Sequence, residues 1–157
     1  MTDLPTSARN VQAALAAAGS GSDVVVLPDS ARTAAEAAAA LGCDVGAIAN
    51  SLVFMADGKP LLVMTSGSHR VDTAALAGRL GKGRIVRADA DEVRAATGQA
   101  IGGVAPVGHP TRLETLIDIA LASYDEIWAA GGTPHAIFAT TYDELVRLTQ
   151  GTEMKVD

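Results

Sequence analysis

The alternation of apolar and polar positions along the chain predicts five helices, most of which begin at a capping residue. Thr33 and Glu36 illustrate the signal, because the hydroxyl lies three residues before the carboxylate, as in a capping box. Near the N-terminus the prediction rests on Val11, Leu15 and Ala18, which share one helical face. The expected helices end at Gly19, Gly42, Gly81, Gly98 and Gly151, and the last three begin at Asp72, Asp89 and Thr141.

Short apolar segments between these helices predict strands. Asp57–Gly58 separates two of them and is a strong hairpin signal, because glycine accepts the positive φ of a tight turn. The expected strands are residues 24–27, 51–55, 60–64, 84–86, 115–119, 126–129 and 136–139. Helices and strands are interspersed, so we expect a mixed-sheet α+β or α/β fold, with residues 1–157 forming a single domain.

Composition is that of a globular protein, with 48% hydrophobic residues and only 3% aromatic residues. The longest alanine-rich run, residues 34–41, is much shorter than the ~20 residues that span a membrane. Residues 1–10 lack the basic and apolar blocks of a secretory signal. A single cysteine, Cys43, excludes an internal disulfide. We therefore expect a cytoplasmic protein with no membrane partner.

The formal net charge of −6 argues against DNA, or any nucleic acid held by bulk electrostatics, because such binding needs a surplus of Lys and Arg. The cluster of Lys82, Arg84 and Arg87 is a local exception, with Arg70 and Arg79 in the preceding segment. A solvated face of a helix or strand is the alternative interpretation of these charges.

The run from Gly102 to His109 is the strongest candidate for a functional loop. Glycine and proline punctuate it, so the backbone can approach a ligand closely. Such a loop can direct several N–H groups at one oxygen and stabilise a developing negative charge. The alternative is a tight connection between two strands.

Reactive side chains give weaker signals. Cys43 has no neighbouring histidine or cation cluster, which favours an inert thiol over a nucleophile. His69, His109 and His135 lack metal-ligand spacing, so no metal is assigned, although a zinc hydrolase is a minor alternative. Each histidine lies in a turn-rich segment, and three such loops in one small domain favour a shared ligand pocket.

An ordered series of segments resembles the YbaK/prolyl-tRNA-synthetase-associated domain family. The similarity covers residues 8–151, and the order of the segments is more specific than any one of them. The matching segments are Ser30–Thr33, Ala47–Phe54, Ser66–Asp72, Ala88–Val93, Thr97–Gly98, Ile101–His109 and Gly132–His135.

This resemblance implies a mixed β-sheet curled toward a barrel, with helices packed outside. It also implies an aminoacyl-tRNA deacylase acting in trans on the ester between a wrongly attached amino acid and the terminal adenosine, including that of tRNA for proline. The implied partners are the acceptor end of aminoacyl-tRNA and an aminoacyl-tRNA synthetase, and no cofactor is implied. A water, helped by a ribose hydroxyl of the substrate, attacks the carbonyl while N–H groups of Gly102–Pro106 hold the oxyanion.

The same resemblance implies roles for individual residues. Gly102 and Gly103 belong to the catalytic loop, and His135 positions substrate or water at the pocket mouth, with core packing as the alternative. Arg70 contacts a phosphate or, alternatively, forms an ion pair with Asp72. The implied substrate-binding residues are Ser66, Gly67, Arg70, Val104, Pro106, Gly131 and Gly132.

Asn50 departs from the family pattern. Many members carry a lysine within the motif that reads Ala49–Leu52 here, and Asn50 keeps hydrogen-bonding capacity but loses the positive charge. Asn50 is therefore a catalytic candidate, and a non-catalytic module that binds aminoacyl-adenosine, an amino acid or a protein partner is the alternative function. Val53, Met64 and Ile101 are candidates for lining the amino-acid pocket, with ordinary core positions as the alternative.

Overall fold

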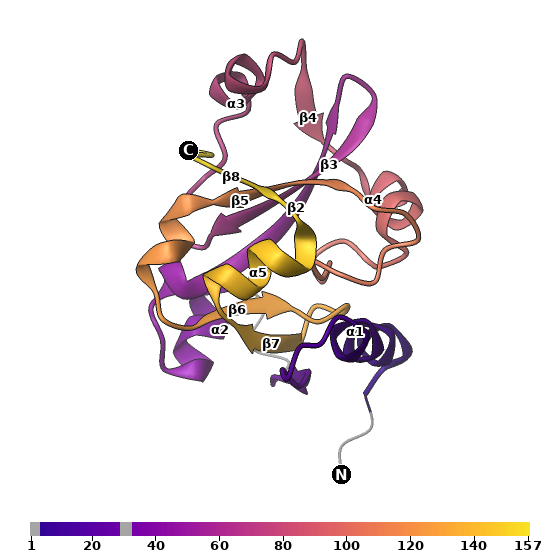
Figure 1. The fold of residues 1–157 in the computed structure, drawn as a ribbon, viewed down its shortest axis with the longest axis vertical. Coiled ribbons are helices and arrows are strands. Elements are labelled where there is room, and N and C mark those ends of the chain that lie inside the picture. The colour runs from indigo at the N-terminus through magenta and orange to yellow at the C-terminus, as the bar shows by residue number, and fades with distance from the viewer. Residues whose placement is uncertain (1–3, 29–32) are drawn as a thin grey trace.

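The computed structural model describes residues 4–28 and 33–157, so Ser30–Arg32 of the first family-like segment lie outside the described residues (Figure 1). The helices are α1 (Thr6–Ala17), α2 (Ala34–Leu41), α3 (Thr73–Leu80), α4 (Ala90–Thr97) and α5 (Tyr142–Thr149), with 3-10 helices η1 (Val45–Ala47) and η2 (Ile119–Ser123). The strands are β1 (Val25–Val26), β2 (Ile48–Ala56), β3 (Lys59–Ser66), β4 (Ile85–Arg87), β5 (Glu114–Asp118), β6 (Ile127–Ala130), β7 (Ala136–Thr140) and β8 (Thr152–Met154).

The helix boundaries follow the capping signals. At α4, the Glu92 amide donates to the Asp89 carboxylate (2.8 Å) and the Asp89 amide donates to the Glu92 carboxylate (3.0 Å), a complete capping box. Two expectations were wrong in detail. The last helix ends at Gln150, which adopts a φ of +50°, rather than at Gly151. Ala18 is exposed at the end of α1 rather than on its buried face.

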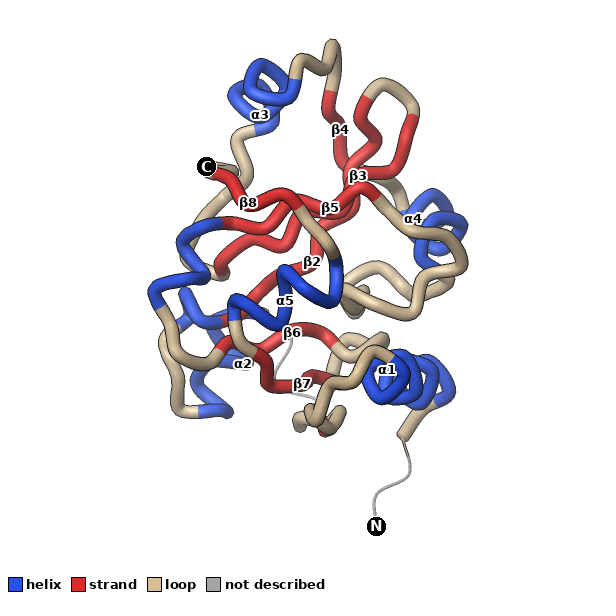
Figure 2. Tube along the Cα trace, in the orientation of Figure 1, coloured by secondary structure: helices blue, strands red, loops and turns tan. Residues whose placement is uncertain are grey.

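The strands form one mixed sheet in the order β1-β7-β6-β2-β3-β5-β8, and β4 pairs with β2 beside this path (Figure 2). β2 and β3 form the expected hairpin, with Asp57 (φ +50°) and Gly58 (φ +83°) at its turn. The pairs β2–β6, β3–β5 and β5–β8 are parallel. The mixed α+β fold is confirmed, but the sheet is not closed into a barrel, because β1 and β8 lie at opposite ends of the path and do not pair with each other.

One edge of β2 is divided between two short strands. β3 pairs with the other edge from Ala49 to Ala56. On the divided edge, β6 pairs with Ile48 and Ala49, and β4 pairs with the segment Phe54–Ala56. The Ala88 amide extends the second pairing by donating to the Val53 carbonyl (3.1 Å). Residues 50–52 therefore face an opening between β6 and β4, and this opening positions the candidate site.

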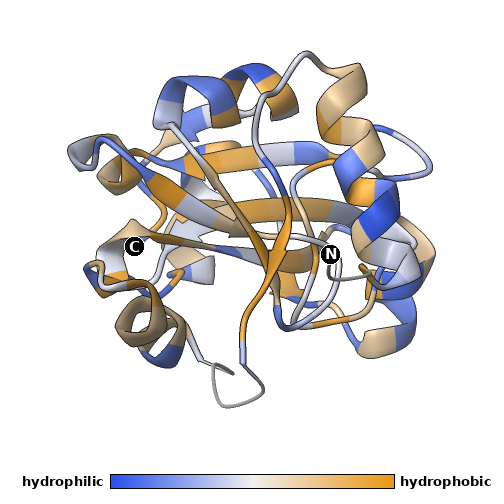
Figure 3. Ribbon diagram, turned by 90° about the horizontal axis from the view of Figure 1, so that it is seen from below, coloured by the Kyte–Doolittle hydropathy of each residue, from blue (hydrophilic) through white to orange (hydrophobic). Residues whose placement is uncertain are grey.

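Apolar side chains pack on both faces of the sheet, and Figure 3 shows orange segments concentrated on its central strands. One core joins Leu15 of α1 and Leu145 of α5 to Phe138 of the sheet. A second core joins Leu76 of α3 to Phe54. Within the two described ranges, no helix has both the length and the hydropathy needed to cross a bilayer.

Candidate active site

A cavity of about 290 Å³ opens beside residues 50–52 of β2, on the edge where neither β6 nor β4 pairs with them. α2, β6 and β7 contribute walls, and Gly102, Val104 and Pro134 border it from two loops. Among the described residues, no side chain that lines the cavity is charged. Its main apolar walls are Leu27, Ala37, Ile48, Leu52, Trp128 and Ile137.

Asn50 is a polar residue in the lining of this largely apolar cavity. It is half-buried on β2, and its carboxamide forms no hydrogen bond with any described residue. The neighbouring Ser51 also lines the cavity, but its hydroxyl donates to the sulfur of Met64 (3.1 Å). The Asn50 carboxamide therefore keeps its donor and acceptor capacity for a bound molecule.

The loop after α4 presents two amides that have no acceptor among residues 4–28 and 33–157. The Gly103 amide donates to the Ala100 carbonyl (3.2 Å), and the Ala105 amide donates to the side-chain oxygen of Gln99 (2.7 Å). For the amides of Gly102 and Val104, the described part of the chain offers no acceptor. Both residues line the cavity, whereas buried Pro106 lines a separate hollow and has no N–H to donate.

This loop is packed directly against the Gly-rich turn that precedes β7. The Gly132 amide donates to the Gly103 carbonyl (2.9 Å). A Cβ on Gly103 would lie 2.3 Å from the carbonyl carbon of Thr133 and 2.5 Å from the backbone nitrogen of Pro134. Gly102 has a φ of +90°, a conformation that favours glycine. Glycine at these positions therefore allows the two backbones to approach each other.

Buried Gln99 braces the loop from behind. Its side-chain nitrogen donates to the Val107 carbonyl (3.0 Å), while its oxygen accepts from the Ala105 amide (2.7 Å). Gln99→Leu leaves both backbone groups unsatisfied, so we expect it to lower the free energy of unfolding by ~2 kcal/mol or more. Urea denaturation measures this loss, and an unchanged midpoint would contradict the bracing role.

His109 closes the same loop and predicts a pH dependence. Its Nε2 lies 2.7 Å from the Ala105 carbonyl, to which the neutral ring donates, and burial lowers the pKa of His109 below its usual value. The unfolded chain therefore binds a proton at a higher pH than the folded chain. We expect stability to fall as the pH drops through the ordinary histidine range, and His109→Gln to weaken that fall. Thermal melts of the wild type and of His109→Gln from pH 7.5 to 5.5 measure how the melting temperature depends on pH. The same dependence in both proteins would contradict the prediction.

The turn that carries His135 borders the cavity through Pro134, and His135 itself is not among the lining residues. The His135 carbonyl accepts from the Leu27 amide (2.7 Å), which joins the turn to the segment after β1. Gly131 and Gly132 are buried and pack against β7 and α1, respectively, outside the cavity wall. The roles of these residues toward a substrate remain predictions.

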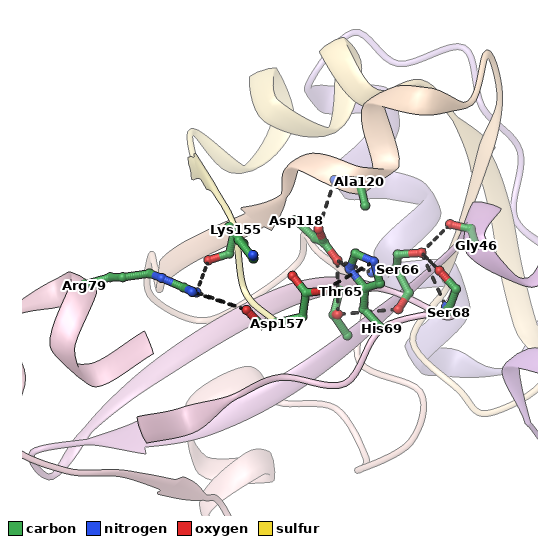
Figure 4. Close-up of polar contacts among 10 residues, drawn as sticks. All are labelled: Gly46, Thr65, Ser66, Ser68, His69, Arg79, Asp118, Ala120, Lys155 and Asp157. Atoms are coloured by element: carbon green, nitrogen blue, oxygen red, sulfur yellow. Dashed lines mark hydrogen bonds and ion pairs between the residues drawn. The ribbon is translucent and has the colours of Figure 1, made fainter. Parts of the chain in front are cut away.

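Ser66 and Asp118 belong to a separate buried network (Figure 4). The Asp118 carboxylate, only 1% exposed, accepts from the amides of Ser66 (3.0 Å) and Ala120 (2.9 Å). It also lies 3.0 Å from Nδ1 of His69. The Ser66 hydroxyl donates to the Gly46 carbonyl (2.7 Å). The network fixes the end of β3 to η1 and η2, and Ser66 does not line the cavity.

Gly67 and Arg70 also lie outside the cavity lining. A Cβ on Gly67 would meet the Val45 carbonyl oxygen at 2.5 Å, so glycine permits close packing against η1. Arg70 is exposed and forms no ion pair within the described ranges, and Asp72 instead caps α3 through the Ala75 amide (3.0 Å). The alternative ion pair between Arg70 and Asp72 is therefore wrong.

The three sequence candidates for the amino-acid pocket take other positions. Val53 and Met64 are buried in the core, and Ile101 is 46% exposed, so the core alternative holds for the first two. Trp128 and Leu27 line the cavity instead and were missed. Their positions depend on the parallel pairing of β2 with β6 and on the pairing of β1 with β7, which no local sequence signal reports.

The remaining reactive groups lie apart from one another. The described residues contain no group of three or more His, Cys, Asp or Glu side chains suited to a metal ion. Cys43 is half-buried, and burial followed by the nearby Asp44 carboxylate raises the pKa of its thiol. A raised thiol pKa lowers the thiolate fraction near neutral pH, which agrees with an inert cysteine.

Comparison with known proteins identifies the family. The family profile of the aminoacyl-tRNA editing domain matches residues 28–148. The chain is 30% identical over 125 residues to the uncharacterized protein YwhH of Bacillus subtilis (strain 168), covering 78% of each. It is 36% identical over 92 residues to proline–tRNA ligase of Bacillus licheniformis, covering 59% of this chain but 16% of the ligase. A solved candidate trans-editing enzyme for prolyl-tRNA synthetase matches with a TM-score of 0.94 and 46% identity over 99% of both chains. The protein belongs to the aminoacyl-tRNA editing domain family.

Proposed function

We propose that this protein hydrolyses the ester bond of mischarged tRNA in trans. One observation carries the proposal: Asn50, Gly102 and Val104 line the same cavity, and among the described residues the Asn50 carboxamide and the two backbone amides have no hydrogen-bond partner. Membership of the editing domain family supports ester hydrolysis at this cavity. The likeness to a candidate trans-editing enzyme for prolyl-tRNA synthetase supports tRNA for proline among the substrates.

In the proposed reaction, a water oxygen bonds to the ester carbonyl carbon, and the carbonyl oxygen takes up negative charge. The amides of Gly102 and Val104 donate to that oxygen, where one such donor typically contributes ~3 kcal/mol. The bond from carbon to the ribose oxygen then breaks. The attacking water gives up its proton, and the departing ribose oxygen gains one through the neighbouring ribose hydroxyl of the substrate. Asn50 donates a hydrogen bond in place of the charge that a lysine would supply.

The residues that line the cavity indicate which class of amino acid it accepts. Its described lining is uncharged and mostly apolar, so a charged substrate side chain would lose its hydration without a compensating partner. A volume of about 290 Å³ holds a small amino acid together with part of the terminal ribose. The proposed substrates are therefore esters of small uncharged amino acids such as alanine, cysteine and serine.

The proposal is tested with a panel of aminoacyl-tRNAs. Purified protein should hydrolyse Ala-, Cys- or Ser-tRNA, including alanine on tRNA for proline, faster than the spontaneous rate, and should leave Lys-tRNA at the spontaneous rate. If every ester on a broad panel stays intact, the enzymatic proposal fails.

The absence of a charged side chain from the described cavity lining favours a second candidate function, a binding module that has lost the reaction. This candidate predicts saturable binding of aminoacyl-adenosine without turnover. It also predicts that Asn50→Lys creates hydrolysis that the natural chain lacks, whereas the enzymatic proposal requires hydrolysis by the natural chain.

A further inference from the structure

Positive charge is concentrated in one segment of this acidic chain. Residues 57–87 contain six Lys and Arg residues and two Asp, whereas the rest of the chain contains six Lys and Arg residues and 16 Asp and Glu. The segment runs from the β2–β3 turn through α3 to β4, and Figure 1 shows that turn, α3 and β4 together at one end of the long axis. Most of the positive charge of residues 57–87 is therefore gathered at that end of the molecule.

Three cations of this segment lie at the β2–β3 turn and beside or within β4. Lys59, Arg84 and Arg87 are exposed, and none forms an ion pair with a carboxylate of residues 4–28 or 33–157. The Arg87 guanidinium lies 5.9 Å above the ring of Phe54, which orients it without neutralising it. We call Lys59, Arg84 and Arg87 the basic end.

The nearby carboxylate of Asp57 is hydrogen-bonded to backbone amides. Asp57 accepts hydrogen bonds from the amides of Gly83 (3.0 Å) and Arg84 (2.8 Å), and these bonds lower the pKa of Asp57. Asp57 lines a hollow together with Met55, Gly58, Arg84 and Val86. An arginine at the edge of an apolar hollow suits a sugar–phosphate unit, because the two parts need different partners.

Arg84 and Arg87, beside and within β4, lie on the same edge of β2 as the candidate active site, whereas Lys59 begins β3 on the other edge. The cavity occupies the opening at residues 50–52, and β4 pairs with that edge at residues 54–56. Ala56 lies six residue steps along the strand from Asn50, which corresponds to ~20 Å. A single-stranded 3′ end held in the cavity and extended along this edge would bring the following phosphates to Arg87 and then to Arg84.

We propose that the basic end binds the phosphate backbone of the tRNA acceptor stem and thereby delivers the 3′ end to the cavity. The inference rests on the proposed function for the identity of the RNA. Phosphate contacts position a nucleic acid without reading its sequence, so this surface contributes affinity and not tRNA identity. With so few cations, the binding is weak and its salt dependence is shallow.

Binding of an RNA that carries no amino acid tests the inference independently of catalysis. The probe is an RNA hairpin with an acceptor-stem duplex and a single-stranded 3′ ACCA end, labelled with fluorescein at its 5′ end. Fluorescence anisotropy compares the wild type with Lys59→Ala/Arg84→Ala across a salt series. The control is Arg112→Ala/Arg147→Ala, which also removes two exposed cations. Both lie outside residues 57–87: Arg112 precedes β5, and Arg147 lies in α5. Circular dichroism confirms that all three proteins are folded.

We expect Lys59→Ala/Arg84→Ala to raise the dissociation constant roughly fivefold and to make the slope of log K against log salt shallower by about 2. The control should bind as the wild type does. Equal dissociation constants and slopes for both double variants would overturn the basic end as an RNA surface. Hydrolysis of mischarged tRNA by the wild type is scored separately, so failure of that reaction does not decide this result.

Discussion

Gly103→Ala is expected to reduce single-turnover hydrolysis of mischarged tRNA by roughly 100-fold or more, the loss seen when an oxyanion donor is removed. The added Cβ would lie 2.3 Å from the carbonyl carbon of Thr133, and backbone atoms cannot rotate away. The loop must therefore move, and with it the amides of Gly102 and Val104. Overpacking of this kind costs ~1–3 kcal/mol, so the melting temperature should also fall by several degrees.

Two further glycine variants separate packing from conformation. At Gly78 in α3 an added Cβ meets no atom within 4 Å, so Gly78→Ala should keep full activity and stability. Gly102→Ala also meets open space, but its φ of +90° would strain alanine by ~1–2 kcal/mol. It should lose activity with a smaller loss of stability than Gly103→Ala. If folded Gly103→Ala hydrolyses the ester at the wild-type rate, the loop does not hold the oxyanion.

Asn50→Ala should lower kcat/KM by roughly tenfold to 100-fold, which corresponds to ~1.4–2.8 kcal/mol of lost transition-state stabilisation. The carboxamide has no hydrogen-bond partner in the described protein, so its removal should leave the melting temperature unchanged. Single-turnover assays measure the change in kcat/KM, and thermal melts measure the melting temperature.

Ser51→Ala is the matched control for Asn50→Ala. Ser51 lines the same cavity, but its hydroxyl is directed to the Met64 sulfur at 3.1 Å, so its removal should leave the rate near that of the wild type. Equal losses in the two variants would show that the cavity is sensitive to any change in volume. That result would remove the evidence for a specific hydrogen bond from Asn50.

Local signals predicted the secondary structure well because caps and turns act within a few residues. Asp89 and Glu92 satisfy each other across one helical turn, and Asp57–Gly58 defines the hairpin without help from distant residues. One missed element, β8, has a long-range cause. β8 is three residues long and is held by parallel pairing with β5, which its own polar sequence does not indicate.

The candidate site was only partly predictable for the same reason. Asn50, Gly102 and Val104 could be singled out from motifs, and the structure brings them to one cavity. The structure adds that Gly103 is a packing residue whose amide is already bonded to Ala100. Ser66 supports Asp118 rather than the cavity, and this requires β3 to end beside η2, a contact between residues far apart in sequence.

The most direct test is single-turnover deacylation of radiolabelled alanyl-tRNA for proline by the wild type and by folded Gly103→Ala. The proposed function predicts hydrolysis by the wild type well above the spontaneous rate, and its near loss in Gly103→Ala. If both proteins bind the aminoacyl end saturably but the ester is hydrolysed only at the spontaneous rate, this result would contradict the proposed function. It would identify the cavity as a binding site without catalysis.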